Sequence, residues 1–391
     1  MKRFAGRWRG RTFWVVRLVA AGKAAWQMAD AAHRCLGDRI ESGVVVTKYD
    51  HVMGAISNFD CYEGGHPVPD ENSFRGTRAA LELVKNLTET DTVLFLLSGG
   101  GSALFELPLI PGEQLQDITN QLLACGADIV EINTIRKRLS AVKGGRFGQL
   151  CTPARVYCVV LSDILGDPLD MIASGPACPD ESTCQQAIAI AQQYQLKLSD
   201  EAWELLKQET PKHLDNVESH ITGSVRELCQ AAANVCRDLG YQPTVLTDRL
   251  CCQAREAGSF LASVAVSHAE TDKPLAFLAG GETVVKLTGH GKGGRNQELA
   301  LAAAQGIAGL DSVLICSFGS DGTDGPTDAA GGIVDGQTEA KLQGQGVSIR
   351  QVLEENDAYH ALERVGGLII TGPTGTNVND VAVVLIRPAE S

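Results

Sequence analysis

The sequence lacks several features that would place it in a common class of protein. No apolar run approaches the roughly 18 residues of a transmembrane helix, which excludes a membrane-spanning segment. No C-x-x-C pair and no H-x-x-x-H spacing occurs, which argues against a built-in zinc site. Positive charge is scarce, because 34 Lys and Arg against 47 Asp and Glu give a formal net charge of −13. A general nucleic-acid binder would need the opposite balance.

Three familiar sequence signatures are missing as well. The segment Ser98–Ser102 (SGGGS) does not continue to the third glycine of the dinucleotide fingerprint. The segment Gly289–Gly294 (GHGKGG) lacks the Ser or Thr that completes a Walker A loop, and no G-x-S-x-G nucleophile elbow occurs. The chain is therefore neither a standard dinucleotide-binding protein nor a standard P-loop enzyme.

Cysteine, by contrast, is frequent, with 12 residues in a chain of 391. The spacing is irregular, and the adjacent pair Cys251–Cys252 suits neither a zinc knuckle nor an ordinary disulfide. Most of the other cysteines lie in apolar runs, where a free thiol packs as a small hydrophobic side chain. We therefore expect reduced thiols and a cytoplasmic protein.

Short apolar runs alternate with helical stretches along the first half of the chain. The runs VLFLL and YCVVL are apolar at every position, which predicts strands whose two faces are both covered by helices. This pattern is typical of an α/β fold with a doubly wound, Rossmann-like parallel sheet. The predicted strands are Trp14–Ala21, Gly43–Thr47, Thr92–Leu97 and Arg155–Leu161, and the predicted helices are Lys23–Leu36, Glu71–Leu87, Glu113–Cys125 and Ala127–Val142.

A polar segment without periodicity, Leu214–Gly223, is the predicted linker between two α/β domains at residues 1–220 and 221–391. Beyond it the alternation resumes. The predicted helices there are Ser224–Leu239, Gln253–His268 and Asn296–Ala308, and the predicted strands are Pro243–Thr247, Pro274–Ala279, Thr283–Leu287, Ser312–Phe318, Gly367–Ile370 and Val381–Ile386.

Five glycine-rich loops directly follow predicted strands. They are Ala20–Lys23, Ser98–Ser102, Ser162–Asp167, Gly319–Gly325 and Thr371–Asn377. Ligands of open parallel sheets bind at the carboxyl ends of strands, and glycine lets backbone N–H groups approach a phosphate or carboxylate. Together the loops predict a site for an anionic small molecule, although any one of them could simply be a tight turn.

Two cations stand in positions suited to that site. Lys23 follows the first strand, where it can act as a point charge for a phosphate or carboxylate, and the alternative is a solvated surface lysine. Arg295 follows glycines at a helix start, where its guanidinium can face a transferring phosphoryl group. The alternative for Arg295 is an ion pair with an acid such as Glu282 or Glu298.

Other polar residues near these loops have two interpretations each. A carboxylate there can hold Mg²⁺ or accept a proton, or it can cap a helix, and we expect two of the six to be functional without saying which. The six are Asp163, Asp167, Asp321, Asp324, Asp328 and Asp380. His66 is more often a structural loop residue than a catalytic one. The basic segment from Asn133 to Arg146 can line an anion site or stabilise a helix end.

Together these strings resemble the glycerate 2-kinase family whose second domain is called MOFRL, sequences of which have also carried a hydroxypyruvate reductase name. The resemblance rests on AAGKAAWQMADAA, EGGHPVPDENS, FLLSGGGSALFELP, GADIVEINTIRKRLSAVKGGR, LSDILGDPLDMIASGP, GGETVVKLTGHGKGGRNQELALAAA, SDGTDGPTDAAGGIVD and TGPTGTNVNDVAVVL. It implies ATP- and Mg²⁺-dependent phosphorylation of D-glycerate to 2-phosphoglycerate, in a cleft between a Rossmann-like domain and a MOFRL-type domain with a mixed sheet. The family's key lysine and arginine correspond to Lys23 and Arg295.

The resemblance also implies how ligands are held. We expect the glycerate carboxylate at Ser98, Gly99, Gly100, Gly101 and Ser102, with Lys143 and Arg146. We expect the ATP phosphates at Gly293, Gly294, Asn296, Thr374, Thr376 and Asn377, and Mg²⁺ at Asp163 and Asp321. Neither a nucleic-acid nor a membrane partner is expected, and the sequence leaves a homodimer open. The competing functions are an NAD(P)H-dependent hydroxypyruvate reductase and a non-catalytic sensor of a sugar acid or phosphate.

Overall fold

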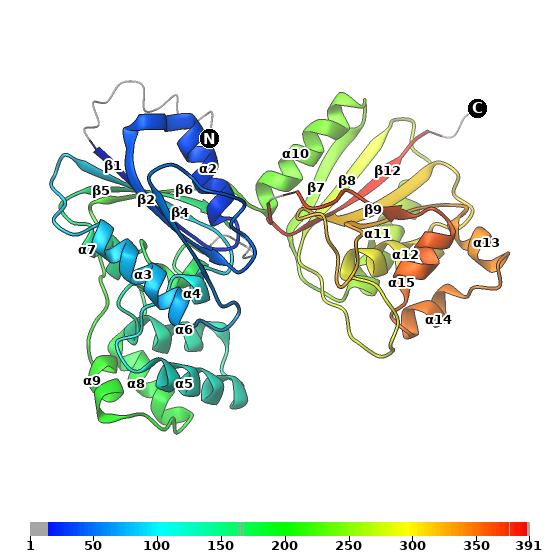
Figure 1. Ribbon diagram of the computed structural model, residues 1–391. Helices are drawn as coiled ribbons and strands as arrows, with labels where there is room; N and C mark the ends of the chain where they lie inside the picture. Colours follow the sequence, from blue (N-terminus) through cyan, green and yellow to red (C-terminus); the bar gives the residue numbers. More distant parts are fainter. Residues whose placement is uncertain (1–14, 163, 165, 167, 375, 389–391) are drawn as a thin grey trace. The chain divides into compact units, whose positions relative to one another are not determined.

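The computed structural model describes residues 15–162, 164, 166, 168–374 and 376–388 (Figure 1). The chain divides into two compact units between Thr222 and Gly223, close to the predicted boundary after residue 220. Both units are α/β, as predicted. Within the described residues no helix is long and apolar enough to cross a membrane, and all 12 cysteines are free.

A six-stranded sheet forms the centre of the first unit, in the order β3-β2-β1-β4-β5-β6. The pairs β2–β3, β1–β2, β1–β4 and β4–β5 are all parallel. This is the strand order of a doubly wound Rossmann-like sheet, so the predicted class is confirmed. The bounds are β1 Val15–Ala21, β2 Ile40–Lys48, β3 Phe59–Gly64, β4 Asp91–Leu97, β5 Arg155–Leu161 and β6 Val217–Gly223.

Both faces of this sheet are buried, which explains the unbroken apolar runs. Successive residues of a strand point to opposite faces, so Leu18 and Ala20 pack in one core and Val19 and Ala21 in the other. Helix α2 (Ala25–Leu36) contributes to the first core and α3 (Glu71–Leu83) to the second. At the middle of the second core, the ring centroid of Phe95 lies 5.4 Å from that of Phe105 and 4.7 Å from that of Phe147.

Four helices of the first unit do not cover the sheet but form a core of their own. They are α5 (Gly112–Ala124), α6 (Ile129–Arg138), α8 (Cys184–Gln193) and α9 (Asp200–Leu206). Figure 1 shows them grouped together away from the strands. The sequence predicted α5 and α6 between two strands but not this helical subdomain, because α8 and α9 join them only through contacts distant along the chain.

The predicted linker Leu214–Gly223 is wrong, because Val217–Gly223 is strand β6 of the first sheet. The Val156 amide donates to the Asn216 carbonyl at 2.8 Å, and the Thr222 hydroxyl donates to the Val160 carbonyl at 3.4 Å. The segment reads as polar because β6 is an edge strand with no fully buried residue.

The second unit has a mixed six-stranded sheet in the order β11-β10-β9-β12-β8-β7, as the family resemblance predicts. Strands β7 and β8 pair in parallel, and the pairs β8–β12, β12–β9, β9–β10 and β10–β11 are antiparallel. The bounds are β7 Gln242–Leu250, β8 Leu275–Gly281, β9 Val313–Gly319, β10 Gly331–Asp335, β11 Leu368–Ile369 and β12 Asp380–Ile386.

Helices cover both faces of this second sheet. Helix α10 (Val225–Asp238) packs on β7 and β8, where Cys229 lies against Gly280. The larger core, which includes Ala279, lies on the other face and is built by five helices. These are α11 (Ala254–Ser267), α12 (Arg295–Gly306), α13 (Thr338–Gln343), α14 (Ile349–Glu354) and α15 (Ala358–Arg364).

One strand prediction in this unit is wrong, and one strand of the sheet was missed. The segment Thr283–Leu287 forms no strand and contributes only the isolated bridge between Gln253 and Val284. Strand β10 was not predicted, since Gly331 and Gly332 lower the strand propensity of its sequence. Its glycine is required by packing: a Cβ at Gly331 would lie 1.9 Å from the Ser317 carbonyl oxygen.

We predict that Phe95→Ala destabilises the first unit by about 3–5 kcal/mol, because it removes a ring buried between two others and leaves a cavity. Urea unfolding followed by circular dichroism measures the loss. The control is Val245→Ala on the exposed edge of β7, which should change stability by less than about 0.5 kcal/mol. Equal effects of the two substitutions would contradict this account of the core.

Candidate functional site

At the carboxyl end of the first sheet, the loops after β1 and β4 touch through their backbones. A Cβ at Gly22 would lie 2.4 Å from the Ser98 carbonyl oxygen, and Gly22 has φ +119°, so only glycine fits. The Ser98 amide donates to the Ala21 carbonyl at 3.0 Å and the Lys23 amide to the Gly99 carbonyl at 2.8 Å. The structure thus brings two of the predicted glycine-rich loops together.

Lys23 lies between these loops with its charge unused. Its Cγ would lie 3.1 Å from a Cβ built on Gly100, which has φ +81°. The side chain is half-buried, and in the described part of the chain its ammonium has neither an ion pair nor a hydrogen bond. A lysine whose backbone is held by hydrogen bonds and whose ammonium has no partner among the described residues is suited to bind an anion.

Ser98 and Gly101 shape the loop from inside. The Ser98 hydroxyl accepts a hydrogen bond from the Ala24 amide at 3.0 Å, just before α2, and its residue is 3% exposed. A Cβ at Gly101 would lie 2.6 Å from that of Ala173. Gly99, Gly100 and Ser102 are more open. The predicted contact of this loop with glycerate therefore has its accessible groups at these three residues.

Lys143 is fully buried beneath the same loop. Its ammonium donates to the carbonyls of Ser102 at 2.8 Å and Phe105 at 3.3 Å, and lies 3.4 Å from a Glu106 carboxylate oxygen. Burial lowers the pKa of Lys143 to about 8, against the opposing charge of Glu106. Arg136 donates to the same Ser102 carbonyl at 3.0 Å. Both cations therefore hold the backbone of this loop by hydrogen bonds to the Ser102 carbonyl. We expected Lys143 to contact the ligand, but its buried ammonium is engaged by the loop instead.

Arg146 is half-buried at the start of α7 (Arg146–Leu150). Its Nε and one terminal nitrogen are buried without a hydrogen-bond partner among the described residues. Burial and the nearby charge of Arg138 lower its pKa. Of the two basic residues predicted to hold glycerate, Arg146 is therefore the one with N–H groups that have no partner among the described residues. Its contact with glycerate stays a prediction.

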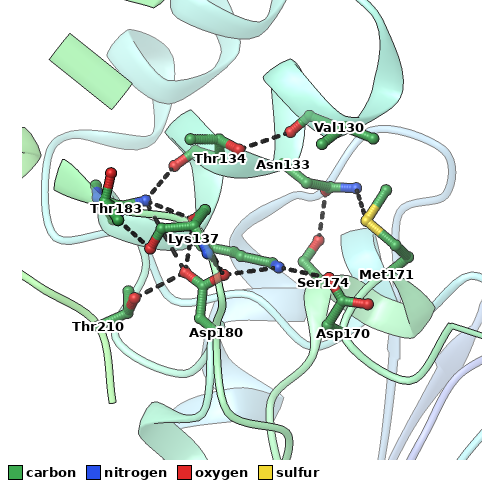
Figure 2. Close-up of polar contacts among 12 residues, drawn as sticks. Val130, Asn133, Thr134, Lys137, Asp170, Met171, Ser174, Asp180, Thr183 and Thr210 are labelled. Atoms are coloured by element: carbon green, nitrogen blue, oxygen red, sulfur yellow. Dashed lines mark hydrogen bonds and ion pairs between the residues drawn. The ribbon is translucent and has the colours of Figure 1, made fainter. Parts of the chain in front are cut away.

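The rest of the basic segment on α6 forms a buried ion network (Figure 2). Lys137 Nζ lies 3.1 Å from Asp180 Oδ1 and 3.3 Å from Asp170 Oδ2, and the Thr210 hydroxyl donates to Asp180 Oδ2 at 2.7 Å. Arg138, with no exposed surface, donates to the Ser182 carbonyl. Burial disfavours the Asp180 carboxylate, but the charge of Lys137 and the Thr210 hydroxyl prevail and lower its pKa. These charges hold the loop after β5 to the helical subdomain.

A left-handed turn in that loop faces the loop after β4. Ala173, Ser174 and Gly175 have φ of 52°, 60° and 64°, an unfavourable run for residues with a Cβ. Figure 2 shows Ser174 next to Asn133, to which its hydroxyl donates at 2.8 Å. The Ser174 and Ser102 hydroxyls are 3.4 Å apart. The strained turn is therefore fixed from α6 and supports Ser102.

In the second unit, Arg295 begins α12 and its charge is paired. Its Nε and Nη2 donate to Asp380 at 2.5 and 3.1 Å, and Nη1 lies 3.2 Å from Glu282. One alternative considered for Arg295, an ion pair with Glu282, is therefore present. The side chain remains 33% exposed, so it can still meet a ligand.

Asp324 caps the same helix. Its Oδ1 accepts from the Asn296 amide at 3.1 Å and its Oδ2 from the Gln297 amide at 2.9 Å. Burial raises the pKa of Asp324, opposed by these two hydrogen bonds. Asn296 is 1% exposed and also accepts from the Ser317 hydroxyl at 2.6 Å. The polar atoms of Asn296 that were expected at ATP are thus already used inside the unit.

Close packing accounts for several glycines of the GHGKGG segment. A Cβ at Gly289 would lie 2.3 Å from Glu355 Cα, one at Gly291 2.4 Å from Asp357 Cβ, and one at Gly294 2.3 Å from Asp324 Cγ. Gly293 has more room, with its nearest atom at 3.3 Å. The glycines are therefore needed for the fold itself, and phosphate binding by Gly293 and Gly294 stays a prediction.

The loops after β9 and before β12 also meet. The Thr374 amide donates to the Asp321 carbonyl at 3.1 Å and the Thr374 hydroxyl to the Ser320 carbonyl at 2.5 Å. Thr374 is exposed, whereas Thr376 and Asn377 are half-buried. The Asn377 side chain accepts from the Asn379 amide at 3.2 Å. Two more of the predicted glycine-rich loops thus lie side by side.

Of the two residues predicted to bind Mg²⁺, the structure describes one. Asp163 lies outside the described residues. Asp321 is half-buried, its Oδ1 accepts from the Thr323 amide at 3.0 Å, and its Oδ2 has no partner among the residues described. In the described part of the chain, no three His, Cys, Asp or Glu side chains form a cluster that could hold a metal ion by themselves.

Sequence reasoning missed the buried acids that organise these loops. Glu106 and Asp180 are 0% and 1% exposed and face Lys143 and Lys137. The signal was present for Glu106, a lone acid in the apolar stretch ALFELP, since an acid in such a run is buried only when it is paired. For Asp180 the local sequence is an ordinary polar loop.

Comparison with known proteins identifies the family of this chain. A family model described as a domain of unknown function, DUF4147, matches residues 6–207, and the MOFRL family model matches residues 275–380. A D-glycerate 2-kinase of Thermotoga maritima is 55% identical over 95% of this chain and 90% of its own length. The chain belongs to the glycerate 2-kinase family with a MOFRL domain.

Two further comparisons agree with this family. A glycerate 2-kinase of Pyrococcus horikoshii is 41% identical over 95% of this chain and 87% of its own length. The crystal structure of a glycerate kinase from Thermotoga maritima has a TM-score of 0.95 and 52% identity, covering 99% of this chain and 94% of that one. The family resemblance seen in the sequence motifs is confirmed.

We predict that Asp180→Asn lowers the free energy of unfolding by about 3–5 kcal/mol at neutral pH, because it removes the buried counter-charge of Lys137 and leaves only the more exposed Asp170. The folded-state pKa of Asp180 is lowered, so its stabilisation is present at neutral pH and is lost as the pH falls through that folded value. Denaturant unfolding at several pH values should therefore show a smaller loss in the variant on acidification. Exposed Asp215→Asn is the matched control and should leave both stability and its pH dependence unchanged.

Proposed function

We propose that this protein transfers the γ-phosphoryl group of ATP to the 2-hydroxyl of D-glycerate and forms 2-phosphoglycerate. The observation that carries the proposal is the 55% identity to a D-glycerate 2-kinase over 95% of this chain. The ammonium of Lys23 supports it, since it has no partner among the described residues and can bind a phosphate or carboxylate without giving up an existing ion pair.

The residues of this chain would act by position and charge. Phosphoryl transfer passes through a loose transition state, so binding geometry and electrostatic stabilisation carry most of the rate enhancement. We assign Lys23 and Arg295 to the charge of the transferring phosphoryl group, and Gly99, Gly100, Ser102 and Arg146 to glycerate. Asp380 and Glu282 hold the Arg295 guanidinium in one orientation, which avoids reordering it during the reaction.

A magnesium ion fits the second unit as part of this proposal. Mg²⁺ in kinases takes one or two carboxylates and fills its other positions with phosphate oxygens and water, so a cluster of three acids is not required. Asp321 Oδ2 has no partner among the described residues and could take the ion. The Oδ1 atoms of Asp321 and Asp380 lie 3.2 and 3.3 Å from where a Gly319 Cβ would be, which places the two carboxylates at the same point of the loop. The ion would neutralise phosphate charge. Asp163 as a second ligand, a cytoplasmic location and a homodimer stay predictions.

The competing functions have less support. An NAD(P)H-dependent hydroxypyruvate reductase would bind a dinucleotide, and the glycine-rich loop after β4 lacks the fingerprint for one. A non-catalytic sensor would bind glycerate or phosphate without turnover.

The deciding experiment incubates the purified protein with D-glycerate and MgATP, and separately with hydroxypyruvate and NADH. We expect ADP and 2-phosphoglycerate in the first mixture, identified by coupled assay and by phosphorus NMR, and no NADH oxidation in the second. Oxidation of NADH without ADP formation would support the reductase instead. Ligand binding with neither reaction would support the sensor.

We predict that Lys23→Ala and Arg295→Ala each lower kcat by about 10²-fold or more, because each removes charge stabilisation from the transferring group. Arg295→Lys should remain well below wild type, since lysine cannot make the paired contact with Asp380. The matched controls are Lys207→Ala and Arg350→Ala, whose ion pairs are exposed and should not affect turnover. Wild-type turnover in both alanine variants would contradict the assignment of these two residues.

A further inference from the structure

Three loops from three parallel strands meet around Gly100. A Cβ built on Gly100 would lie 3.0 Å from His66 Cδ2, 3.1 Å from His66 Nε2 and 3.1 Å from Lys23 Cγ. His66 follows β3, Lys23 follows β1, and Gly100 belongs to the loop after β4. The imidazole of His66 and the side chain of Lys23 therefore approach the same point, at the open part of the loop assigned above to glycerate.

The His66 ring is a polar group without a hydrogen-bond partner in the part of the chain that the structure describes. Neither of its nitrogens hydrogen-bonds to a residue in the described ranges, although the ring is half-buried. Other histidines at loops and helix ends are paired, such as His51 with the Tyr49 carbonyl and His360 with Asp357. A half-buried imidazole that is left unpaired beside a lysine has its nitrogens free for a ligand.

The backbone that carries His66 is well fixed. Asp70 caps α3 by accepting from the Ser73 amide at 2.9 Å, and it also accepts from the Tyr49 hydroxyl at 2.6 Å. A Cβ at Gly65 would lie 2.4 Å from the Val68 carbonyl oxygen, so this turn is tightly packed. The backbone that carries the ring is therefore held in place by the cap of α3 and by close packing of the turn.

The surroundings of His66 favour its neutral form. Burial lowers its pKa below the ordinary 6.5, and the charges of Lys23 after β1 and Lys48 at the end of β2 lower it further, with His51 also nearby. On its own loop, the Asp70 carboxylate is engaged by Tyr49 and Ser73. At neutral pH the ring thus keeps a lone pair that can accept a proton, which is what a general base requires.

We propose that His66 is the general base of the reaction, a role that rests on the proposed glycerate 2-kinase function. One of its ring nitrogens accepts the proton of the glycerate 2-hydroxyl while that oxygen forms a bond to the γ-phosphorus of ATP. The bond from the γ-phosphorus to the bridging oxygen breaks, and ADP leaves with that electron pair. The proton then passes from the imidazolium to solvent.

The first test compares His66→Gln with the wild type at saturating MgATP. We expect kcat to fall by about 10²-fold with KM for glycerate within a few fold, because the side chain acts on proton transfer. A neutral base is needed, so wild-type kcat/KM should fall as the pH drops through the His66 pKa, below 6.5. In the variant this acid limb should be absent. Exposed His213→Gln is the control and should keep both turnover and the limb.

The second test changes the charge around His66 and leaves the ring in place. Lys48→Met removes one of the positive neighbours that lower its pKa, so the acid limb should move to higher pH while the plateau of kcat stays unchanged. NMR titration of the His66 ring in the unaltered protein should give the same midpoint as the limb. Imidazole added to His66→Ala should restore part of the turnover, as expected for a missing base rather than a damaged fold.

The outcomes separate the two proposals. A protein that forms 2-phosphoglycerate, but keeps full turnover and an unchanged acid limb in His66→Gln, would overturn the role of His66 alone. The same holds for a limb that stays in place in Lys48→Met while the NMR midpoint of His66 moves. Failure of the wild type to phosphorylate glycerate would overturn the kinase proposal first.

Discussion

The backbone contact between Gly22 and Ser98 is the constraint on which the first site depends. It brings the ends of β1 and β4 so close that a single methyl group at Gly22 would collide with the Ser98 carbonyl. With the two loops joined by hydrogen bonds from Ser98 and Lys23, the side chain of Lys23 has to emerge over Gly100, next to His66. The polar groups at this edge are thereby placed by backbone packing, before any ligand binds.

A second layer of buried charge supports that arrangement. Lys143 joins the loop after β4 to Glu106, and Lys137 joins the loop after β5 to α6 through Asp180 and Asp170. A buried charge is costly unless it is paired, so each pair fixes its loop in one conformation. Some cations of the described residues, such as Lys137 and Lys143, are therefore fully engaged by buried partners. Others, such as Lys23 and Arg146, keep donors that have no partner among those residues.

The features that could be predicted from the sequence are those that depend on residues close together along the chain. The parallel sheet, the loops at its carboxyl edge and the placement of Lys23 follow from local apolar runs and glycine positions. Strand β6 was missed because an edge strand carries polar residues. Strand β10 was missed because it contains Gly331, which close packing against Ser317 on a neighbouring strand requires. The helical subdomain could not be predicted, since its core joins α5 and α6 to helices more than forty residues further along the chain.

By itself, the sequence determined the α/β class, the glycine-rich turns at strand ends and the two cations at the starts of helices, because these depend on short-range patterning and backbone freedom. The family motifs likewise needed no coordinates. Only the tertiary structure decided which polar groups have partners inside the protein. Lys143 faces Glu106, and Asn296 is hydrogen-bonded to Asp324 and Ser317. Within the described ranges the His66 ring, close to Lys23, has no hydrogen-bond partner. The physical reason is that the state of a polar group is set by its partners and burial, and those are supplied by residues distant in sequence.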